Sequence, residues 1–214
     1  YVPMTPFGRR PLSLGQVASQ MAIRQALEET AKPGANAPSA INKWHVSRTL
    51  TDIRTRLGVS DRALSVLAAL LSFHPETALT LPKPRRPASG DGAAAGEGVS
   101  CELVVFPSNK ALAQRAHGMA PKTLWRHLTA LVDDGLIIRR DSPNGKRYAR
   151  KDASGEDRFA EAFGFDLTPL VARAAEFETI AEEMKAAQKR RALTKERISL
   201  MRRDITKTIA LALD

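Results

Sequence analysis

Apolar residues recur at helical spacing along the first third of the chain. This pattern predicts helices over 12–31, 41–57 and 60–74. Gly58 supplies a stop for the second helix, and Ser60 is a suitable N-cap for the third. We therefore expect the amino-terminal part of the chain to be helical.

The last part of the chain predicts a second helical region. From Thr168 to near Leu213 there is almost no helix breaker, and apolar residues follow one another three or four positions apart. Gln and basic residues interrupt this pattern at 188–191. The segment is therefore either one long helix with a polar break or two helices packed as a hairpin. Its apolar stripe either forms a dimer seam or packs back against the amino-terminal helices.

The middle of the chain predicts a strand followed by two short helices. The apolar run at 103–106 is typical of a strand, and Ser108 can cap a helix over 109–116. Gly118 supplies a turn before a second helix over 122–134. Two short helices joined by a few residues that include Gly form the helix-turn-helix pattern.

The second of these helices has one apolar and one polar face. The stripe predicted to be buried consists of Leu124, Leu128, Leu131 and Val132. Lys122 and Arg126 lie on the opposite face, beside Trp125 and Thr129. An Arg at such a position can donate two hydrogen bonds to a guanine edge in the major groove, while Lys and Thr contact phosphates. The alternative is an ordinary amphipathic surface helix.

The residues after this helix predict a basic β-hairpin. A strand is expected over 136–140, an Asn-Gly turn follows at Asn144, and a basic run covers 147–151. The return strand is either 146–150 or the later segment 163–167. We favour the later segment because its apolar residues alternate as a half-buried strand requires. The alternative to a DNA-contacting wing is a solvated charged hairpin.

These elements predict a mainly α fold with a small β wing. We expect an amino-terminal helical extension over 1–58, a winged helix-turn-helix domain over 59–167 and a long carboxyl-terminal helix or helical hairpin over 168–214. The segment 82–100 is rich in Pro and Gly and is predicted to be a disordered loop inside the winged domain.

The charge of the chain favours an anionic partner. Its 214 residues include 33 Lys and Arg against 23 Asp and Glu, a net charge of +10. Between Phe106 and Lys151 there are ten basic and three acidic residues, so most of the excess lies in the predicted winged domain. Binding should therefore weaken steeply with salt.

Composition also excludes several classes of protein. No apolar run approaches the roughly 20 residues of a membrane span, and no secretory signal is visible, so a cytoplasmic protein without a membrane partner is expected. Cys101 is the single cysteine, which excludes an intrachain disulfide and a cysteine-rich zinc site. No cofactor or metal is predicted.

The candidate DNA-binding residues come from the helix-turn-helix and the wing. Lys122, Trp125 and Arg126 are expected in the major groove, whereas the wing cations are expected at the DNA backbone or minor groove. The full predicted set is Ser108, Asn109, Lys110, Lys122, Thr123, Trp125, Arg126, Thr129, Arg139, Arg140, Asn144, Lys146, Arg147, Tyr148 and Arg150.

Three other functions compete with this prediction. A nicking enzyme would need a tyrosine nucleophile beside metal-binding histidines, but the histidines are scattered and only Tyr1 and Tyr148 could attack. We therefore expect a protein that is not an enzyme. A winged-helix transcriptional regulator would use the same DNA-reading module. A protein-interaction module on the same scaffold would show no salt-sensitive DNA binding.

Several literal sequence runs resemble RepC of the RepABC plasmids of alphaproteobacteria. The runs are Thr5 to Arg10, Gly58 to Leu64, Leu71 to Thr77, Phe106 to Asn109, Arg115 to Met119 and Asp141 to Tyr148. The resemblance covers nearly the whole chain and is more specific than a helix-turn-helix alone. It implies the amino-terminal region of a longer replication initiator. Its partner would be double-stranded DNA at the plasmid origin, with host replication proteins as further partners and a monomer or homodimer as the binding unit.

Overall fold

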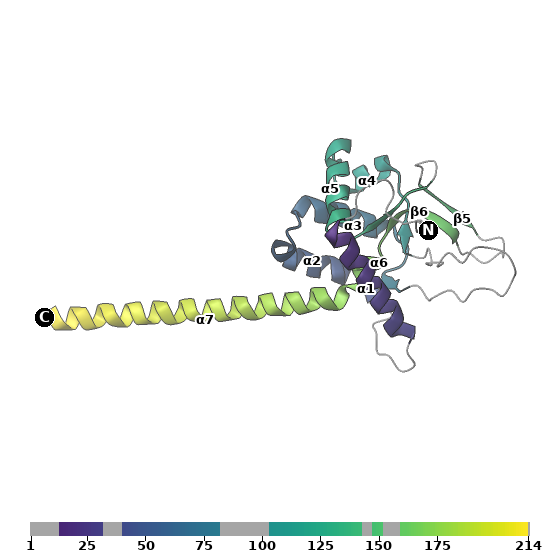
Figure 1. The fold of residues 1–214 in the computed structure, drawn as a ribbon. Helices are drawn as coiled ribbons and strands as arrows, with labels where there is room; N and C mark the ends of the chain where they lie inside the picture. The colour runs from purple at the N-terminus through teal and green to yellow at the C-terminus, as the bar shows by residue number, and fades with distance from the viewer. Residues whose placement is uncertain (1–12, 32–39, 82–102, 143–146, 152–158, 214) are drawn as a thin grey trace.

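The computed structural model describes residues 13–31, 40–81, 103–142, 147–151 and 159–213 of the chain. Within these ranges the fold is mainly helical with small antiparallel sheets, so this part of the predicted fold class is confirmed (Figure 1). The helices are α1 (Leu14–Ala31), α2 (Lys43–Leu57), α3 (Asp61–Phe73), α4 (Asn109–Arg115), α5 (Pro121–Asp133), α6 (Thr168–Ala172) and α7 (Ala174–Leu213). The strands are β1 (Ala40–Asn42), β2 (Ala78–Thr80), β3 (Val104–Val105), β4 (Ile138–Arg140), β5 (Tyr148–Lys151) and β6 (Phe159–Asp166).

The main apolar core is built around α3. Leu67, Leu70 and Leu71 of this helix are fully buried, and α3 packs against α2, α4 and α5. The same cluster includes Leu50 of α2 and Phe177 of α7. Residues from the amino-terminal, middle and carboxyl-terminal parts of the described chain therefore share one core.

Polar side chains set the starts of the helices much as the sequence indicates. Ser60 accepts a hydrogen bond from the Ala63 amide at 3.2 Å and caps α3, as predicted. The expected start of the second helix at Ile41 is wrong, because the Asn42 side chain accepts from two amides of the first turn and α2 begins at Lys43. Ile41 instead lies in strand β1, which pairs with β2.

The first helix also begins later than predicted, at Leu14 instead of residue 12. The hydroxyl of Ser13 accepts from the Gln16 amide at 3.2 Å, and the Gln16 side chain accepts from the Ser13 amide at 2.9 Å. This reciprocal pair is a capping box. It fixes the register of α1 at its first turn.

The second sheet confirms the longer of the two predicted hairpins. Strand β6 pairs with β4 through Ile138↔Asp166 and with β5 through Tyr148↔Phe163, and all of these pairs are antiparallel. Strand β3 pairs with β6 as well, through Val105↔Phe165. The segment at 163–167 thus supplies the return strand, while the Asn-Gly turn and the whole 82–100 segment lie outside the described residues.

Helices α1 and α5 meet through two glycines. A Cβ atom on Gly15 would stand 2.2 Å from the carbonyl oxygen of Asp133, and one on Gly135 would stand 2.2 Å from the carbonyl oxygen of Gly15. The Ser13 hydroxyl donates to the Asp133 carbonyl at 2.9 Å, and the Ser19 hydroxyl donates to the Gly135 carbonyl. The amino-terminal helix is therefore held against the end of α5 by backbone contacts that leave no room for a methyl group.

The carboxyl-terminal segment is one long helix after a short one. Arg173 separates α6 from α7, and α7 runs without a break through 188–191, so the helical hairpin alternative is wrong. Gln, Lys and Arg are good helix formers, which explains why a polar interruption of the stripe does not end the helix.

Phe177 and Ala181 are buried against the body, and the rest of α7 extends away from it (Figure 1). Packing back on the amino-terminal helices thus holds only for the first turns of α7. None of the described helices has both the length and the apolar character that spanning a membrane requires.

We expect Gly15→Ala to destabilise the protein by about 1 to 3 kcal/mol, because its methyl group would meet backbone atoms that have no rotamer to change. Helix propensity alone predicts the opposite sign, since Ala favours helix over Gly by about 1 kcal/mol. Urea unfolding measures the difference, with Gln25→Ala on the exposed face of α1 as the control. A Gly15→Ala protein as stable as the wild type would contradict the close contact.

Candidate nucleic-acid interface

Helix α5 separates its residues into a buried and an exposed face, as predicted. Leu124, Leu128, Leu131 and Val132 all lie in the core. On the other face Lys122 and Arg126 are exposed, Trp125 is 54% exposed, and Thr129 is half-buried. A Trp so open to solvent is unusual for a side chain whose large apolar ring favours burial. The surface of α5 therefore presents cations together with an aromatic ring.

The turn between α4 and α5 is tight and locally determined. The Ser108 hydroxyl accepts from the Ala111 amide at 3.1 Å and caps α4, as predicted. After α4, His117 and Gly118 take left-handed backbone angles with φ of 59° and 70°. The Gly118 amide then donates to the Ala113 carbonyl at 2.9 Å. This turn directs α5 across α4 with its basic face outward.

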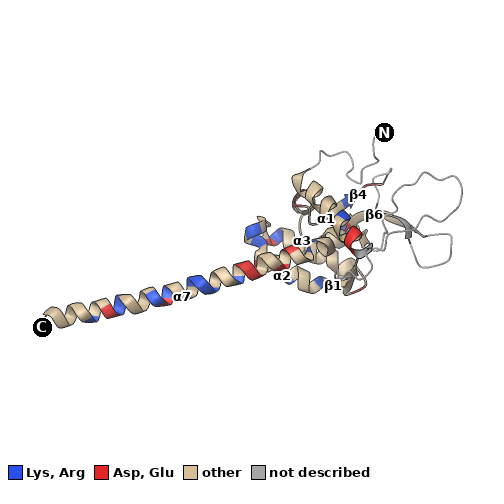
Figure 2. Cartoon of the chain, turned by 60° about the horizontal axis from the view of Figure 1, so that its bottom comes forward, with Lys and Arg blue, Asp and Glu red and all other residues tan. Residues whose placement is uncertain are grey.

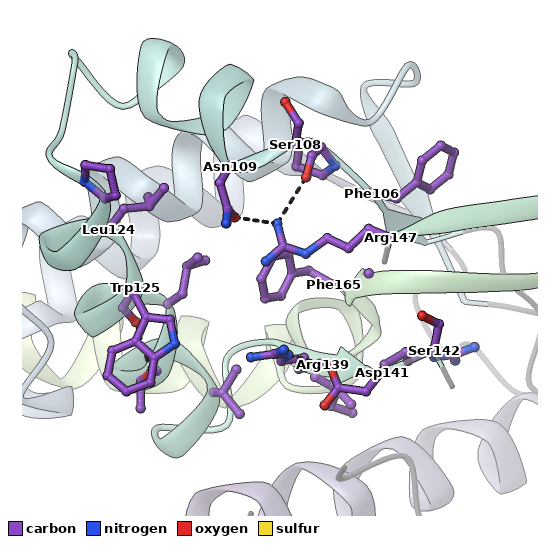
Figure 3. A pocket seen from close by; sticks show the side chains of 18 of the residues that line it. Phe106, Ser108, Asn109, Leu124, Trp125, Arg139, Asp141, Ser142, Arg147 and Phe165 are labelled. Atoms are coloured by element: carbon purple, nitrogen blue, oxygen red, sulfur yellow. Dashed lines mark hydrogen bonds and ion pairs between the residues drawn. The ribbon is translucent and has the colours of Figure 1, made fainter. Parts of the chain in front are cut away.

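A cleft of about 540 Å³ lies between α5, the start of α4 and the β4–β6 sheet (Figure 3). Trp125 and Thr129 line it from α5, and Arg139 lines it from β4. Asn109 and Arg147 lie on its other walls. The cleft thus joins the exposed face of α5 to the predicted wing, and hydrogen-bonding groups line much of its wall.

Arg147 has a supporting role inside this cleft. Its Nη1 donates to the carbonyl oxygen of Pro107 at 3.1 Å and to Oδ1 of Asn109 at 2.9 Å (Figure 3). Its guanidinium also lies over the Phe165 ring, 4.4 Å from the centroid. Burial, with Arg139 nearby, lowers the pKa of Arg147, but an Arg stays charged at any ordinary pH. The residue ties the beginning of β5 to the loop before α4, so its guanidinium is partly committed to the fold.

Arg140 is committed to the fold more completely. Its Nη2 donates to Oδ2 of Asp166 at 2.5 Å, and the Asp166 side chain is almost wholly buried. Asp166 also accepts from the amide and hydroxyl of Thr168 at the start of α6. Removing one partner of such a buried pair leaves an uncompensated charge. Arg140, which is predicted to contact DNA, has this internal partner in the structure.

Three predicted cations remain exposed and have no hydrogen-bond or ion-pair partner among the described residues: Lys110 on α4, and Lys122 and Arg126 on α5. Arg139 differs from them because its Nε donates to Asp141 at 2.6 Å, although both side chains stay more than a third exposed. An unpaired surface cation keeps its full capacity to neutralise a phosphate or to donate to a base.

The other predicted residues are half-buried, paired within the sheet or outside the described residues. Thr123 is half-buried in the first turn of α5, and the half-buried Tyr148 has its ring 5.1 Å from that of Phe163. Arg150 pairs with Glu161 in the β5–β6 ladder. Asn144 and Lys146 lie outside the described residues, as does the side chain of Arg150.

Arg173 joins α6 and α7 to the end of α5, a supporting role that the sequence does not predict. Its Nη1 donates to the carbonyl oxygens of Asp134 and Gly135 at 3.4 and 3.3 Å, and its guanidinium makes two hydrogen bonds of 2.8 Å to Glu176. The hydrogen bonds from Arg173 hold the pKa of Glu176 below its usual value. The carbonyls that it contacts come from a segment almost forty residues away, so no local pattern signals the contact.

His127 lies on α5 beside the basic face but points into the protein. It is 7% exposed, and its Nε2 has no hydrogen-bond partner among the described residues. Burial lowers the pKa of His127, and the positive charges of Arg126 and Arg62 lower it further. The histidine is therefore neutral at pH 7 in the folded chain.

Comparison with known proteins identifies the family of this chain. A model of the family described as "Replication protein C N-terminal domain" matches residues 10–86 and 98–213. The chain belongs to the replication protein C family. The residues between the two matched ranges, 87–97, lie inside the segment rich in Pro and Gly. The match therefore includes the helices and strands of the cleft.

Two curated relatives carry the name "Putative replication protein C". The one from Sinorhizobium fredii is 46% identical over 210 residues, and the one from Rhizobium rhizogenes is 44% identical over 210 residues. Each alignment covers 98% of this chain and 45% of the relative. This replication protein C chain thus spans less than half the length of these relatives. No solved structure matches it.

The buried His127 of this replication protein C chain predicts a pH-dependent stability. Because its pKa is lower in the folded than in the unfolded chain, the unfolded chain takes up the proton first as the pH falls. The free energy of unfolding then decreases below the unfolded-state pKa of about 6.5. Gln cannot titrate, so the free energy of unfolding of His127→Gln should depend less on pH than that of the wild type. Urea unfolding between about pH 7.5 and 5 measures both. The two proteins share all other titrating groups, and parallel pH profiles would refute the linkage.

Proposed function

We propose that this chain is the DNA-binding domain of a plasmid replication initiator and that it binds duplex DNA at the plasmid origin. Membership of the replication protein C family and the names of the two relatives support a role in replication. The observation that carries the proposal is the surface of α5, where Lys122 and Arg126 are exposed beside Trp125 and have no hydrogen-bond or ion-pair partner in the described part of the chain. Such binding would take place in the cytoplasm, where bacterial plasmids are found.

In this proposal α3, α4 and α5 form the three helices of a winged helix-turn-helix. Helix α5 is the recognition helix, because it follows the tight turn and turns its charged face away from the core. The wing consists of β4 and β6, with β5 continuing it beyond their paired ends. The helix and the wing border the same cleft, which leaves a channel for one strand of the DNA backbone.

The contacts are divided according to which side chains the fold leaves available. Arg126 reads a base edge in the major groove, and Trp125 makes apolar contacts beside it. Lys122 lies beside these two residues in the major groove. Lys110, on α4, contacts a phosphate. Asn144, Lys146 and Arg150 have side chains outside the described residues, and for them the proposal rests on the sequence alone, which predicts contacts to the backbone or the minor groove. Arg140 and Arg147 chiefly hold the wing in place.

Arg126→Ala should weaken binding to the specific site by about 1 to 3 kcal/mol and change binding to random duplex little, because a bidentate contact to guanine carries sequence information. Lys110→Ala should weaken both alike and reduce the salt slope by about one, as loss of a phosphate contact requires. Fluorescence anisotropy on short duplexes tiled across the replicon that encodes the chain measures these effects.

Arg56→Ala provides a matched control for these variants, since Arg56 is an exposed Arg on α2 away from the cleft. It should bind both DNAs as the wild type does. Equal losses on specific and random DNA for Arg126→Ala would remove the base-reading role of Arg126. Absence of salt-sensitive binding to any duplex would remove the proposed function itself.

We also propose that the domain does not cut DNA. Tyr148 is the one tyrosine in the described ranges, and its ring is half-buried against Phe163. A nucleophile for strand transfer needs open access to a phosphate. Incubation of supercoiled origin plasmid with the protein and a divalent metal should leave the plasmid supercoiled. Nicked plasmid in that assay, lost in Tyr148→Phe, would establish an enzyme instead.

A further inference from the structure

Most of α7 is a solvent-exposed helix that carries large apolar side chains. Beyond its first turns, Ile198, Met201, Ile205 and Ile209 are each 50 to 59% exposed. They follow one another at intervals of three or four residues, so they share one side of the helix. An apolar stripe of this kind on an otherwise charged helix marks an interaction surface.

The exposed stripe continues the one that seats α7 on the body. Phe177 is buried, and Ile180 and Met184 are packed against the core. Counting heptads from Phe177 as position a places Ile198 and Ile205 at a as well. Met201 falls at d, like Ile180. The same face of α7 is therefore covered by the body at one end and uncovered at the other.

Two threonines at d positions are compatible with an apolar seam. The hydroxyls of Thr194 and Thr208 donate to the carbonyls four residues earlier, both at 2.9 Å. Their hydrogen-bonding capacity is thus satisfied within the helix, and their methyl groups remain for contact with a partner. Leu193 and Leu200 lie outside this stripe.

The residues that flank the stripe are strongly basic. Between 185 and 213 the helix has nine basic and two acidic residues, and Figure 2 shows Lys and Arg distributed along it. The e and g positions from 188 to 204 hold Gln188, Arg190, Lys195, Arg197, Arg202 and Asp204. These are the positions that determine which helix can pair with a heptad seam.

The same charges disfavour pairing of α7 with a second copy of itself. In a parallel, in-register pair, Arg190 would face Lys195 of the other chain, and Arg197 would face Arg202. Arg191, at position a, would face its own equivalent inside the seam. Like charges in these places repel, and a helix with acidic flanks would meet attractive charges at every one of them.

We propose that the exposed part of α7 is a docking site for a partner protein that presents an acidic amphipathic helix. The apolar a and d residues of the two helices form the seam, and Glu or Asp of the partner pairs with Arg190, Lys195, Arg197 and Arg202. A further acidic residue of the partner lies opposite Arg191. This site is separate from the cleft beside α5 and does not depend on DNA binding.

The test uses the 214-residue chain and a synthetic four-heptad peptide with Ile at a, Leu at d and Glu at e and g. Fluorescence anisotropy of the labelled peptide should show saturable binding to the wild type, and a matching peptide with Lys at e and g should bind far less. A variant with reversed charges beside the seam carries the substitutions Arg190→Glu, Lys195→Glu, Arg197→Glu and Arg202→Glu. It should bind the acidic peptide roughly tenfold or more weakly and now prefer the basic peptide.

A second variant with four charge reversals on the opposite side of the helix controls for net charge. It carries Lys185→Glu, Lys189→Glu, Arg203→Glu and Lys207→Glu and should stay within about threefold of the wild type for the acidic peptide. Circular dichroism checks that both variants keep their helix content. Equal losses in the two variants, or no binding of the acidic peptide by the wild type, would overturn the proposal.

Two other partners could cover the exposed stripe of α7, namely a second copy of the chain and DNA. Sedimentation of the wild-type chain tests the first. The proposal predicts no self-association through α7, so Ile198→Asn and Ile205→Asn should not change the sedimentation of the protein alone. A dimer that dissociates on these substitutions would assign the seam to a second copy and overturn the proposal. Loss of random-duplex binding in both charge variants, without peptide binding, would assign α7 to DNA and likewise overturn it.

Discussion

The carboxyl end of α5 is the point at which distant parts of the chain are joined. The last carbonyls of a helix have no partners within it and must be satisfied from outside. Here Ser13 and Ser19 of the α1 region supply hydroxyl donors, and Arg173 supplies a guanidinium from the junction of α6 and α7. The contact of Gly15 with Gly135 brings the backbones close enough for these bonds. The position of α5 thus depends on both ends of the described chain.

This arrangement divides the cations of the domain into two groups. Arg140 and Arg147 bond to acceptors within the fold and hold the sheet against the start of α4 and α6. Lys110, Lys122 and Arg126 have no such partners among the described residues and remain free on α4 and α5. A rigid support beneath unpaired cations is what recognition of a duplex requires, because little side-chain or backbone order must then be gained on binding.

Local patterns in the sequence were enough to predict much of this site. The leucine stripe of α5 and the cap at Ser108 depend on residues within a few positions of each other, so spacing alone reveals them. The partner of Arg140 lies 26 residues away, and the acceptors of Arg147 lie about forty residues away. A single sequence contains no signal for such pairs, so basic residues of the wing all looked equally available. The short strands β1 and β2 were missed for a related reason, since three residues are too few to show an alternating pattern.

We propose above all that α5 reads base edges of a duplex through Arg126. Methylation interference on the bound replicon fragment tests it most directly, because a methyl group on guanine N7 blocks the acceptor that a bidentate Arg uses. We expect at least one guanine whose methylation prevents binding of the wild type and no longer affects binding of Arg126→Ala. An identical interference pattern for both proteins, or no interfering guanine at all, would contradict it.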